Sequence, residues 1–389
     1  MSKDPRHERQ LAVRRFLNRE KPLSICTSLG KSQSWLYKWV NRFDPEDPSW
    51  CESRSTRPFG HSHRTPIEIE EIVKMIRLNL YNNELFCGAQ AILWEMEDLD
   101  VIPLPSERTI NRILARNDLT HKRTGPYEPK GTPYPVLPVE RPNQTHQADL
   151  AGPRYLKGPI RFYSQNAVDL ATGRCGVEPI PGKNSQNIIN ALWNIWDRMG
   201  VPENLQIDNE ASFYGSRRHP RAMGSLIRLC LHNGVEPWFI PMSEPWRNGV
   251  VEWFNNHHKQ KFLRKITIAG WDKLLESSLA FEYKHNNRHR YTKLGGKTPL
   301  EALAASGAAL VFPKEKTPPV HPLPKPDTGR YHLVRLIRNK LRIDIFGETF
   351  PVASDLQYEY VVATIDVKEQ RLKLVHNNVQ VDEFDYKLR

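Results

Sequence analysis

The chain has 389 residues, a formal net charge of +12 and a pI near 9.4, so it is expected to attract polyanions such as nucleic acid. No apolar run approaches the ~18 residues that a membrane-spanning helix needs, and a membrane protein is therefore not expected. The five cysteines are scattered, without a CxxC pair, which is typical of reduced thiols in a cytosolic protein. Cys51, His61 and His63 do not have the spacing of a common zinc site, and no zinc is predicted there.

Proline-rich stretches divide the chain into parts. Six of the seventeen residues of 126–142 are proline, and so are six of the fourteen residues of 313–326. Such runs favour extended linkers rather than packed structure. The predicted domains are two helical units at 1–50 and 64–125, a core at 143–312 and a small domain at 327–389.

Residues 1–50 are expected to be helical. "RQLAVRRFLN" is amphipathic, "PLSICTSLG" predicts a short helix ending at Gly30, and "KSQSWLYKWVNRF" has a buried stripe of Leu36, Trp39 and Val40. Two short helices around a Gly-containing turn predict a helix-turn-helix unit. The first 45 residues hold ten Lys or Arg and four Asp or Glu, half of the net charge, which favours DNA binding. The residues expected to face DNA are Gln33, Ser34, Tyr37, Lys38 and Arg42.

Residues 64–125 predict a second helix-turn-helix unit. Its helices are "PIEIEEIVKMIRLNLYNN", "GAQAILWEMEDL" and "PSERTINRILARNDL", the last with Ser106 as its cap. Acidic residues are frequent in the first two helices, so the charge argument for DNA binding is weaker here. DNA contact by Arg108, Asn111 and Arg112 and a purely structural role are both open.

Residues 143–312 alternate strands with helices. The strands are predicted in "THQADLAG", "IRFYSQNAVDL", "RCGVEPI", "ENLQID" and "VEPWFI", and a helix, "SQNIINALWNIWDRMG", ends at Gly200. A basic segment, "SRRHPRAMGSLIRLC", is predicted as loop and then helix. The next helix lies in "EPWRNGVVEWFNNHHKQKF", with Ser243 as its expected cap and Gly249 inside it. The pattern predicts a layered α/β domain with a mixed sheet.

Residues 327–389 alternate short strand runs with turns such as "RNK", "FGE" and "HNN". About five strands in some sixty residues predict a small β-barrel. Small barrels bind proteins as often as nucleic acid, so the partner of this domain stays open.

Three acids of the core lie where their side chains can converge. Asp149 is within the first strand, Asp208 closes the fourth, and Glu252 lies one turn inside the later helix. Open α/β sheets place their sites at the carboxyl ends of strands. Asp169 is the alternative to Asp149, but it leads into a tight turn, "DLATGR", where an acid serves its own backbone. Asp149 is therefore preferred.

A cation is expected between these acids, because three neighbouring carboxylates repel one another. Hard oxygen ligands select Mg²⁺ or Mn²⁺, and two such ions about 3.5–4 Å apart can stabilise both the attacking and the leaving oxygen in phosphoryl transfer. Asn256 and Lys259 share a helical face with Glu252 and are predicted to contact DNA. Arg288 and His289 are further candidates for DNA contact, with a structural role equally open.

Three stretches, in this order, resemble one family. "QIDNEASF", "EPWRNGVVEWFNNHHKQKF" and "YKHNNRHRYTKLGGKTPLEAL" look like the catalytic core of DDE transposases of bacterial insertion sequences, whose retroviral-integrase-like core has a ribonuclease-H-like fold. The resemblance covers nearly the whole chain, since helix-turn-helix units before the core and a small barrel after it also occur in that group. It implies that Asp149, Asp208 and Glu252 are the catalytic, metal-binding acids.

The chain departs from that family's pattern in three places. Between Asp208 and Glu252 lie 43 residues, more than is usual, and the basic stretch 216–224 accounts for the excess. Glu210 stands where Gly is common and is a second-choice ligand. His146 occupies the position, three residues before the first acid, where an aromatic residue is usual.

The resemblance implies a DNA transposase of the bacterial cytoplasm, at the nucleoid, that uses two Mg²⁺ or Mn²⁺ ions per active site. It would bind double-stranded element ends and target DNA as a homo-oligomer, cleave to expose a 3′-hydroxyl, and join that hydroxyl to the target. The alternatives are a DNA-binding regulator with an inactive core and a structure-selective nuclease of the same fold.

Overall fold

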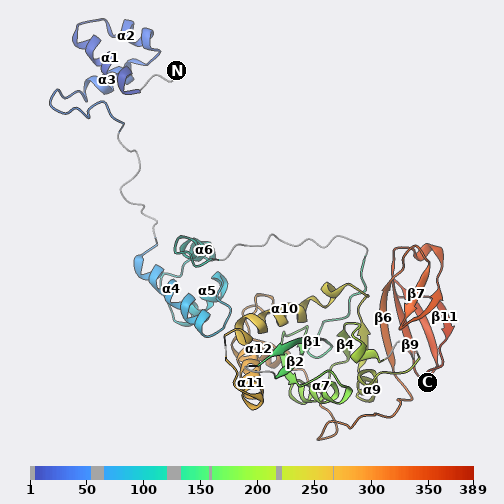
Figure 1. Ribbon diagram of the computed structural model, residues 1–389. Coiled ribbons are helices and arrows are strands. Elements are labelled where there is room, and N and C mark those ends of the chain that lie inside the picture. The colour runs from blue at the N-terminus through green and yellow to red at the C-terminus, as the bar shows by residue number, and fades with distance from the viewer. Residues whose placement is uncertain (1–4, 54–64, 121–132, 157–159, 216–220, 266) are drawn as a thin grey trace. The chain divides into compact units, whose positions relative to one another are not determined.

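The computed structural model describes residues 5–53, 65–120, 133–156, 160–215, 221–265 and 267–389 (Figure 1). The chain forms two compact units, Met1–Arg64 and Thr65–Arg389. Among the described residues, no helix combines the length and the apolar character that crossing a membrane would require. The predicted boundaries at residues 1 and 64, and His61 and His63, lie outside the described residues.

The first unit contains the three predicted helices, α1 (Pro5–Leu17), α2 (Pro22–Leu29) and α3 (Gln33–Val40). Gly30 ends α2 in the left-handed region at φ +64°, and Ser32 caps α3 by accepting a hydrogen bond from the backbone N–H of Trp35. Ala12, Ile25 and Leu36, one from each helix, are buried together in its core. The geometry is that of two short helices joined by a Gly turn, as the sequence predicts.

The second unit begins with three more helices, α4 (Ile67–Asn82), α5 (Ala89–Asp98) and α6 (Glu107–Arg116). Ser106 caps α6 as predicted, accepting from Thr109 N. Val73, Ile92 and Ile110 are fully buried between the helices. The helices are therefore confirmed, while their DNA-binding role stays a prediction.

A mixed sheet forms the centre of the second unit. Its first five strands are β1 (Thr145–Tyr155), β2 (Arg161–Asp169), β3 (Cys175–Ile180), β4 (Asn204–Ile207) and β5 (Glu236–Phe239). Their order is β3-β2-β1-β4-β5, with β1, β2 and β3 antiparallel and β4 and β5 parallel to β1. This mixed sheet with its helices fits the predicted ribonuclease-H-like core.

Helices cover both faces of this sheet (Figure 1). Tyr163 and Ala167 of β2 pack against α7 (Ser185–Met199) and α9 (Ser225–His232), whereas Phe162 and Val168 face α10 (Gly249–His258) and α11 (Trp271–Arg288). The alternation follows from the two-residue period of a strand. Two short helices, α8 (Ala211–Tyr214) and α12 (Pro299–Ser306), complete the layers.

Gly176 of β3 allows α7 to approach the sheet closely. A Cβ at this position would lie 2.6 Å from Ile195 Cγ2 and 2.9 Å from Met199 Sδ, both on α7. These distances are too short for carbon–carbon and carbon–sulfur contacts. Only glycine fits here without moving the helix.

The third family-like stretch, "YKHNNRHRYTKLGGKTPLEAL", supports the sheet. Asn286 of α11 accepts from Cys175 N and donates to Cys175 O, both at 2.9 Å, and so occupies the free edge of β3. Thr298 and Glu301 form a capping box at the start of α12, with Pro299 in its first turn. The Asn and the Thr-Pro of this stretch therefore have structural roles.

The C-terminal strands continue the central sheet. They are β6 (Arg330–Leu336), β7 (Arg342–Ile345), β8 (Glu348–Pro351), β9 (Tyr360–Asp366), β10 (Arg371–His376) and β11 (Val379–Asp385). β6 pairs in parallel with β5 and antiparallel with β9, so that one nine-stranded sheet runs from β3 to β11, and β7 and β8 form a separate hairpin. The expectation of a separate small barrel is corrected in this respect. Without β6, the backbone N–H and C=O groups on the outer edge of β5 would be unpaired, and β6 forms hydrogen bonds with them.

The proline-rich segment 313–326 packs on the core, which also differs from the expectation of a linker without packed structure. Gln186 of α7 donates to Pro319 O at 3.1 Å and accepts from His321 N at 2.7 Å. Leu323 is buried against the main core. The segment is extended and pairs with no strand, but side chains of α7 and α9 bind its backbone.

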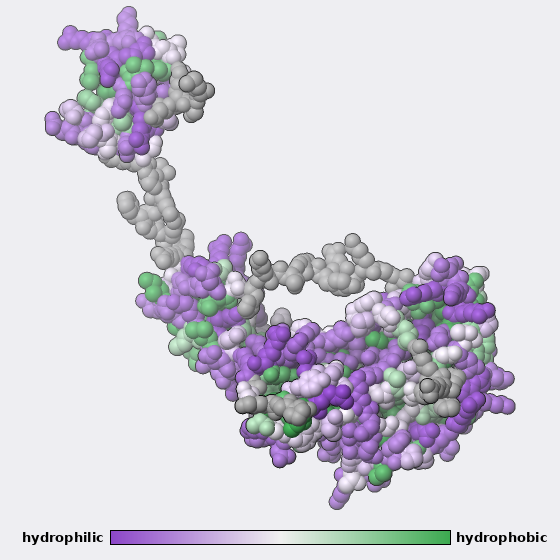
Figure 2. Space-filling model, in the orientation of Figure 1, coloured by the Kyte–Doolittle hydropathy of each residue, from purple (hydrophilic) through white to green (hydrophobic). Residues whose placement is uncertain are grey.

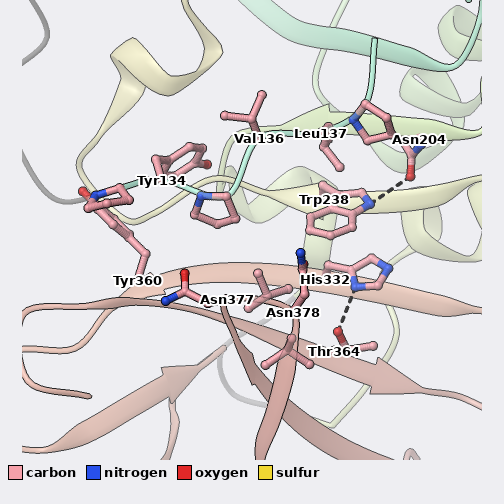
Figure 3. A pocket seen from close by; sticks show the side chains of 15 residues that line it. Tyr134, Val136, Leu137, Asn204, Trp238, His332, Tyr360, Thr364, Asn377 and Asn378 are labelled. Atoms are coloured by element: carbon pink, nitrogen blue, oxygen red, sulfur yellow. Dashed lines mark hydrogen bonds between the residues drawn. The ribbon is translucent and has the colours of Figure 1, made fainter. Parts of the chain in front are cut away.

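The described part of the other proline-rich segment, 133–142, also lies on the core. Tyr134 stacks under the guanidinium of Arg247, 4.1 Å from the ring centroid, and meets the ring of Tyr360 edge-on at 5.2 Å. Together with Trp238 and His332, whose rings stack at 3.9 Å, this segment lines a cavity of about 520 Å³ (Figure 3). Residues 126–132 of the predicted linker lie outside the described residues.

Candidate active site

Asp149 and Asp208 stand at the same level on neighbouring parallel strands. β1 and β4 pair Gln147 with Gln206, and each Asp follows its Gln by two residues. Residues two apart lie on the same side of a strand, so Asp149 extends on the same side of the sheet as Gln147. Both acids are only partly buried and are accessible from outside.

The first turn of α10 brings Glu252 to this side of the sheet. The side-chain oxygen of Gln147 accepts from the backbone N–H groups of Val250 and Val251 at 3.0 and 3.1 Å. The unpaired N–H groups at the start of α10 are therefore satisfied by the strand that carries Asp149. This contact fixes the helix beside β1 and determines where Glu252 can reach.

The three acids interact electrostatically. Burial raises the pKa of Asp208 to about 6, and the negative charge of Asp149 contributes to that rise. Burial also raises the pKa of Asp149, with a contribution from the charge of Glu210. The pKa of Glu252 is raised by burial and then by Asp149. Asp149 is the centre of the group, and a cation among these carboxylates would relieve their repulsion.

The donor set fits a hard divalent cation. Asp149, Asp208 and Glu252 offer carboxylate oxygens, the ligands that Mg²⁺ and Mn²⁺ prefer. All three are partly exposed, which leaves coordination positions for water or a substrate oxygen. Asp149 and Asp208 follow paired residues of β1 and β4, and the charge of Asp149 acts on both Asp208 and Glu252, while a metal site among the three acids stays a prediction.

Two residues of this site, Lys183 and Asn255, were not predicted from the sequence. Lys183, just before α7, forms an ion pair with Glu210 and lowers the pKa values of Asp149 and Asp208 by its positive charge. Asn255 donates to Asp149 Oδ2 at 2.6 Å and accepts from Asn166 at 2.6 Å. The position of Asn255, three residues after Glu252 on one helical face, was the signal that could have identified it.

Asp169 takes part in its own turn, as its sequence context suggests. It is fully buried, and its carboxylate accepts from the backbone N–H groups of Asn143, Ala171 and Thr172 and from the Thr172 hydroxyl. Asp169, on β2, is the antiparallel partner of His146 on β1, three residues before Asp149. With its oxygens engaged by these donors, Asp169 has little capacity left for a metal ion.

His146 stands in the core as an aromatic residue would. It is fully buried, and its Nε2 lies 3.0 Å from Asn143 Oδ1. Burial lowers its pKa to about 4, so the ring is neutral at pH 7. The departure from the family's pattern at this position therefore preserves an uncharged, planar side chain.

The start of the Glu252 helix differs from the expectation. Ser243 has φ +62° and does not cap a helix; Pro245–Asn248 form one 3₁₀ turn, and the α-helix begins at Gly249. Apart from its chain neighbours and the backbone of its own helix, no described heavy atom lies within 4 Å of a Cβ built on Gly249, so packing against another element does not require glycine there. The helix continues as a π-helical turn at Lys259–Leu263.

The predicted DNA-facing side of α3 is largely free. Gln33, Ser34, Tyr37 and Lys38 are exposed, whereas Leu36 and Trp39 are buried on the opposite side. Arg42 is half-buried, with its guanidinium 5.1 Å from the Trp39 ring. Hydrophilic residues also cover most of the surface seen in Figure 2.

The other predicted DNA contacts differ in exposure. Arg108, Arg112, Asn256 and Arg288 are exposed, whereas the side chain of Asn111 donates to Glu107 O of its own helix. His289 is 1% exposed and cannot reach DNA as placed, so the structural alternative holds for it.

Lys259 lines a cavity that two arginines also border. The cavity, of about 520 Å³, is also lined by Arg154 from the end of β1 and Arg264 after the π-helical turn. Asp149 lies on the same strand as Arg154, and Glu252 is seven residues, about two helical turns, before Lys259. Three basic side chains therefore line a cavity formed by the same strand and the same helical segment that carry Asp149 and Glu252.

No protein-family model and no curated protein matches this chain. Similar solved structures include the magnesium complex of the HTLV-2 integrase catalytic core domain in its trimeric form, at 18% identity and a TM-score of 0.34, covering 42% of this chain and 99% of that one. A chain of the simian T-cell lymphotropic virus intasome with PP2A regulatory subunit B56 gamma matches at 15% identity and a TM-score of 0.37, covering 82% and 97%. At these scores the fold assignment rests on the strand order and the site on its own geometry.

Proposed function

We propose that this chain is a DNA transposase that cleaves element ends to expose a 3′-hydroxyl and joins that hydroxyl to target DNA. The observation that supports the proposal is electrostatic: burial raises the pKa values of Asp149, Asp208 and Glu252, and the charge of Asp149 adds to the rise at Asp208, on the neighbouring strand, and at Glu252, on the helix. Such a group is costly to keep unless cations occupy it, and phosphoryl transfer is the chemistry that two hard cations support.

The side chains of the site would bind the metal ions and orient the carboxylates. The three acids would bind two Mg²⁺ or Mn²⁺ ions, which when bound would activate the attacking oxygen and stabilise the leaving oxygen of a phosphodiester. Asn255 fixes Asp149 through its 2.6 Å hydrogen bond, and Lys183 holds Glu210 in an ion pair near the acids. The proposed reaction forms no covalent intermediate on the protein.

The DNA would be held by the basic surfaces. Lys259, Arg154 and Arg264 line one cavity and would contact DNA phosphates there. The exposed side of α3, with Tyr37 and Lys38, would recognise the element ends. Since two ends have to be joined to one target, we propose that the protein acts as a homo-oligomer on DNA.

The test is a joining assay with labelled duplexes. The substrates are duplexes with the sequences that flank the gene, where a transposase would require inverted repeats, in Mg²⁺ or Mn²⁺, with wild type, Glu252→Gln and Asp169→Asn. Joined products are expected to vanish with Glu252→Gln and to remain with Asp169→Asn at a temperature where it stays folded. Glu276→Gln is the matched control, because Glu276 is an exposed acid on α11.

The other outcomes decide between the alternatives. Binding to the repeats without cleavage in either metal would contradict the enzyme and leave a DNA-binding regulator with an inactive core. Cleavage without joining would identify a structure-selective nuclease of the same fold. Loss of joining with Asp169→Asn but not with Glu252→Gln would contradict the choice of acids.

A further inference from the structure

A second cluster of potential metal ligands lies away from the carboxylates. It consists of His257 on α10 and of His285 and His289 at the end of α11. Their exposed fractions are 8%, 0% and 1%, and the ring centroid of His289 lies 4.8 Å from that of His257 and 4.7 Å from that of His285. One ring nitrogen of each lies within 4.8 Å of the other two.

Each of these rings has a buried nitrogen without a partner. His257 Nε2, His285 Nδ1 and His289 Nδ1 make no hydrogen bond to any residue that the structure describes. A buried polar atom left unpaired costs about 1–3 kcal/mol. Three such atoms in neighbouring rings are not explained by packing alone, because apolar side chains of similar size would avoid that cost.

The hydrogen-bond partners of His285 identify which nitrogen is free to bind. Its Nε2 lies 3.3 Å from Gly173 O and 3.0 Å from the Tyr291 hydroxyl. A carbonyl oxygen can only accept, so the bond to Gly173 places the hydrogen on Nε2. Nδ1 then carries a lone pair. Metal-bound histidines show this arrangement, one nitrogen on the ion and the other donating to a carbonyl.

The spacing of the ligands is also that of a zinc site. His285 and His289 are four residues apart and so lie on one side of α11, as in the His-x-x-x-His pairs that bind zinc from a helix. His257 comes from the helix packed beside it. Three histidines with an open fourth position are a known zinc ligand set, and a Zn–N bond of about 2.0–2.1 Å requires nitrogens about 3.4 Å apart. The nitrogens lie within 4.8 Å of one another, so the rings would have to move closer together to bind the ion.

We propose that His257, His285 and His289 bind one Zn²⁺ ion that joins α10 to α11. The site is separate from the carboxylates in chemistry as well as in place, since neutral imidazoles suit zinc rather than Mg²⁺. The ring of Phe86, from the segment between α4 and α5, packs on the cluster. Its centroid lies 4.4 Å from the ring centroid of His289 and 5.2 Å from that of His257. Because α10 also carries Glu252, the ion would stabilise the helix that presents a catalytic acid.

The first test is metal binding by the purified full-length protein. After removal of metal with a chelator, the protein is titrated with Co²⁺, followed by its visible absorption, and bound Zn²⁺ is counted by elemental analysis. We expect one tightly bound ion per chain and a Co²⁺ spectrum of nitrogen ligands at low coordination number. The Asp208→Asn variant is expected to keep this ion, which separates it from any metal at the carboxylates.

Matched variants show whether the three histidines are responsible. His289→Gln and His257→Gln, on different helices, are expected to lower the affinity for Zn²⁺ at least about 100-fold. His258→Gln is the control, because His258 is equally buried on α10 and has an unpaired Nε2 but is not part of the cluster. It is expected to bind one ion like the wild type.

A thermal melt supplies a second readout. Zn²⁺ is expected to raise the Tm of the wild type and of His258→Gln, and to leave that of His289→Gln unchanged. If the wild type binds neither Zn²⁺ nor Co²⁺, or if His289→Gln and His257→Gln both bind as the wild type does, the three rings are a packed aromatic cluster and the proposal is wrong. None of these outcomes depends on whether the chain joins DNA.

Discussion

Helix α10 contributes to two clusters with opposite properties. Glu252 is grouped with Asp149 and Asp208, which are partly exposed like Glu252; burial raises the pKa values of all three, and the charge of Asp149 adds to the rise at the other two. His257, five residues later, joins a buried cluster of rings with unpaired nitrogens. The carboxylates place several negative charges close together, whereas each ring of the histidine cluster has one buried nitrogen without a hydrogen bond among the described residues.

The difference indicates different uses of a cation. The carboxylates are partly exposed, so ions bound among them would keep room for water and substrate oxygens and could exchange. The imidazole cluster lies beneath Phe86 and would keep its ion as part of the structure. Helix α10 thus contributes to one cluster whose ions would exchange and to another whose ion would stay bound. Variants of the carboxylates are expected to change DNA joining, and variants of the histidines to change Zn²⁺ binding and Tm.

The largest effect is expected from Asp208→Asn on DNA joining. The variant loses a charged ligand of the ions but keeps the shape of the side chain, so joining is expected to fall by about a thousandfold or more, roughly 4 kcal/mol in the barrier. The measurement is the initial rate of joined product in Mg²⁺. Asp272→Asn, which removes an exposed acid from the first turn of α11, is the control and is expected to keep the rate.

The carboxylates could be predicted because their signals are local. Asp208 ends an apolar strand, Glu252 lies on a readable helix, and the turn "DLATGR" explains Asp169 within a few residues. Helix ends at Gly30, Ser106 and Gly200 follow from capping and left-handed backbone in the same way. Where the physical cause lies within one turn or one strand, the sequence is sufficient.

The rest depends on partners far apart in the chain. His257 and His285 are 28 residues apart, and only the packing of two helices places them together. The pairing of β6 with β5, and the contact of Gly176 with α7, likewise join segments with no shared local pattern. Ser243 was expected to cap a helix because of its residue type alone, but the chain turns there through a positive φ instead.

Asn255→Ala is expected to have an intermediate effect, on metal affinity. The variant removes the 2.6 Å hydrogen bond that orients Asp149, and loss of such a partner typically weakens metal binding 10–100-fold. The Mg²⁺ concentration for half-maximal joining is therefore expected to rise by that factor, with the rate at saturating Mg²⁺ largely restored. Asn256→Ala, at the exposed neighbouring position predicted to contact DNA, is expected to change the DNA concentration needed for joining but not the Mg²⁺ dependence. A loss that saturating Mg²⁺ does not restore would mean that Asn255 acts on the DNA instead.

The last expected effect is on the free energy of unfolding of the metal-free protein. Its sign shows whether a carboxylate destabilises the fold, as expected for Asp208, or stabilises it, as expected for Asp169. The folded-state pKa of Asp208, about 6, lies above its ordinary value of 3.8, so between these values the folded chain binds more protons than the unfolded chain. Stability contributed at this site therefore falls as the pH rises from about 4 to 6 and stays low above that. In a chelator at pH 7.5, Asp208→Asn is expected to be more stable than the wild type by about 1–3 kcal/mol.

The matched variant, Asp169→Asn, is expected to change stability in the opposite direction. It replaces a carboxylate that accepts from three backbone N–H groups and a hydroxyl, and should cost about 2–3 kcal/mol. Urea unfolding at pH 4.5 and 7.5 measures both differences. If Asp208→Asn destabilises the metal-free protein at pH 7.5 as Asp169→Asn does, the carboxylates are not held in mutual repulsion. The electrostatic reason to place a cation among them would then be lost, because a carboxylate whose pKa is raised by burial and by the charge of Asp149 is expected to gain stability when it is neutralised.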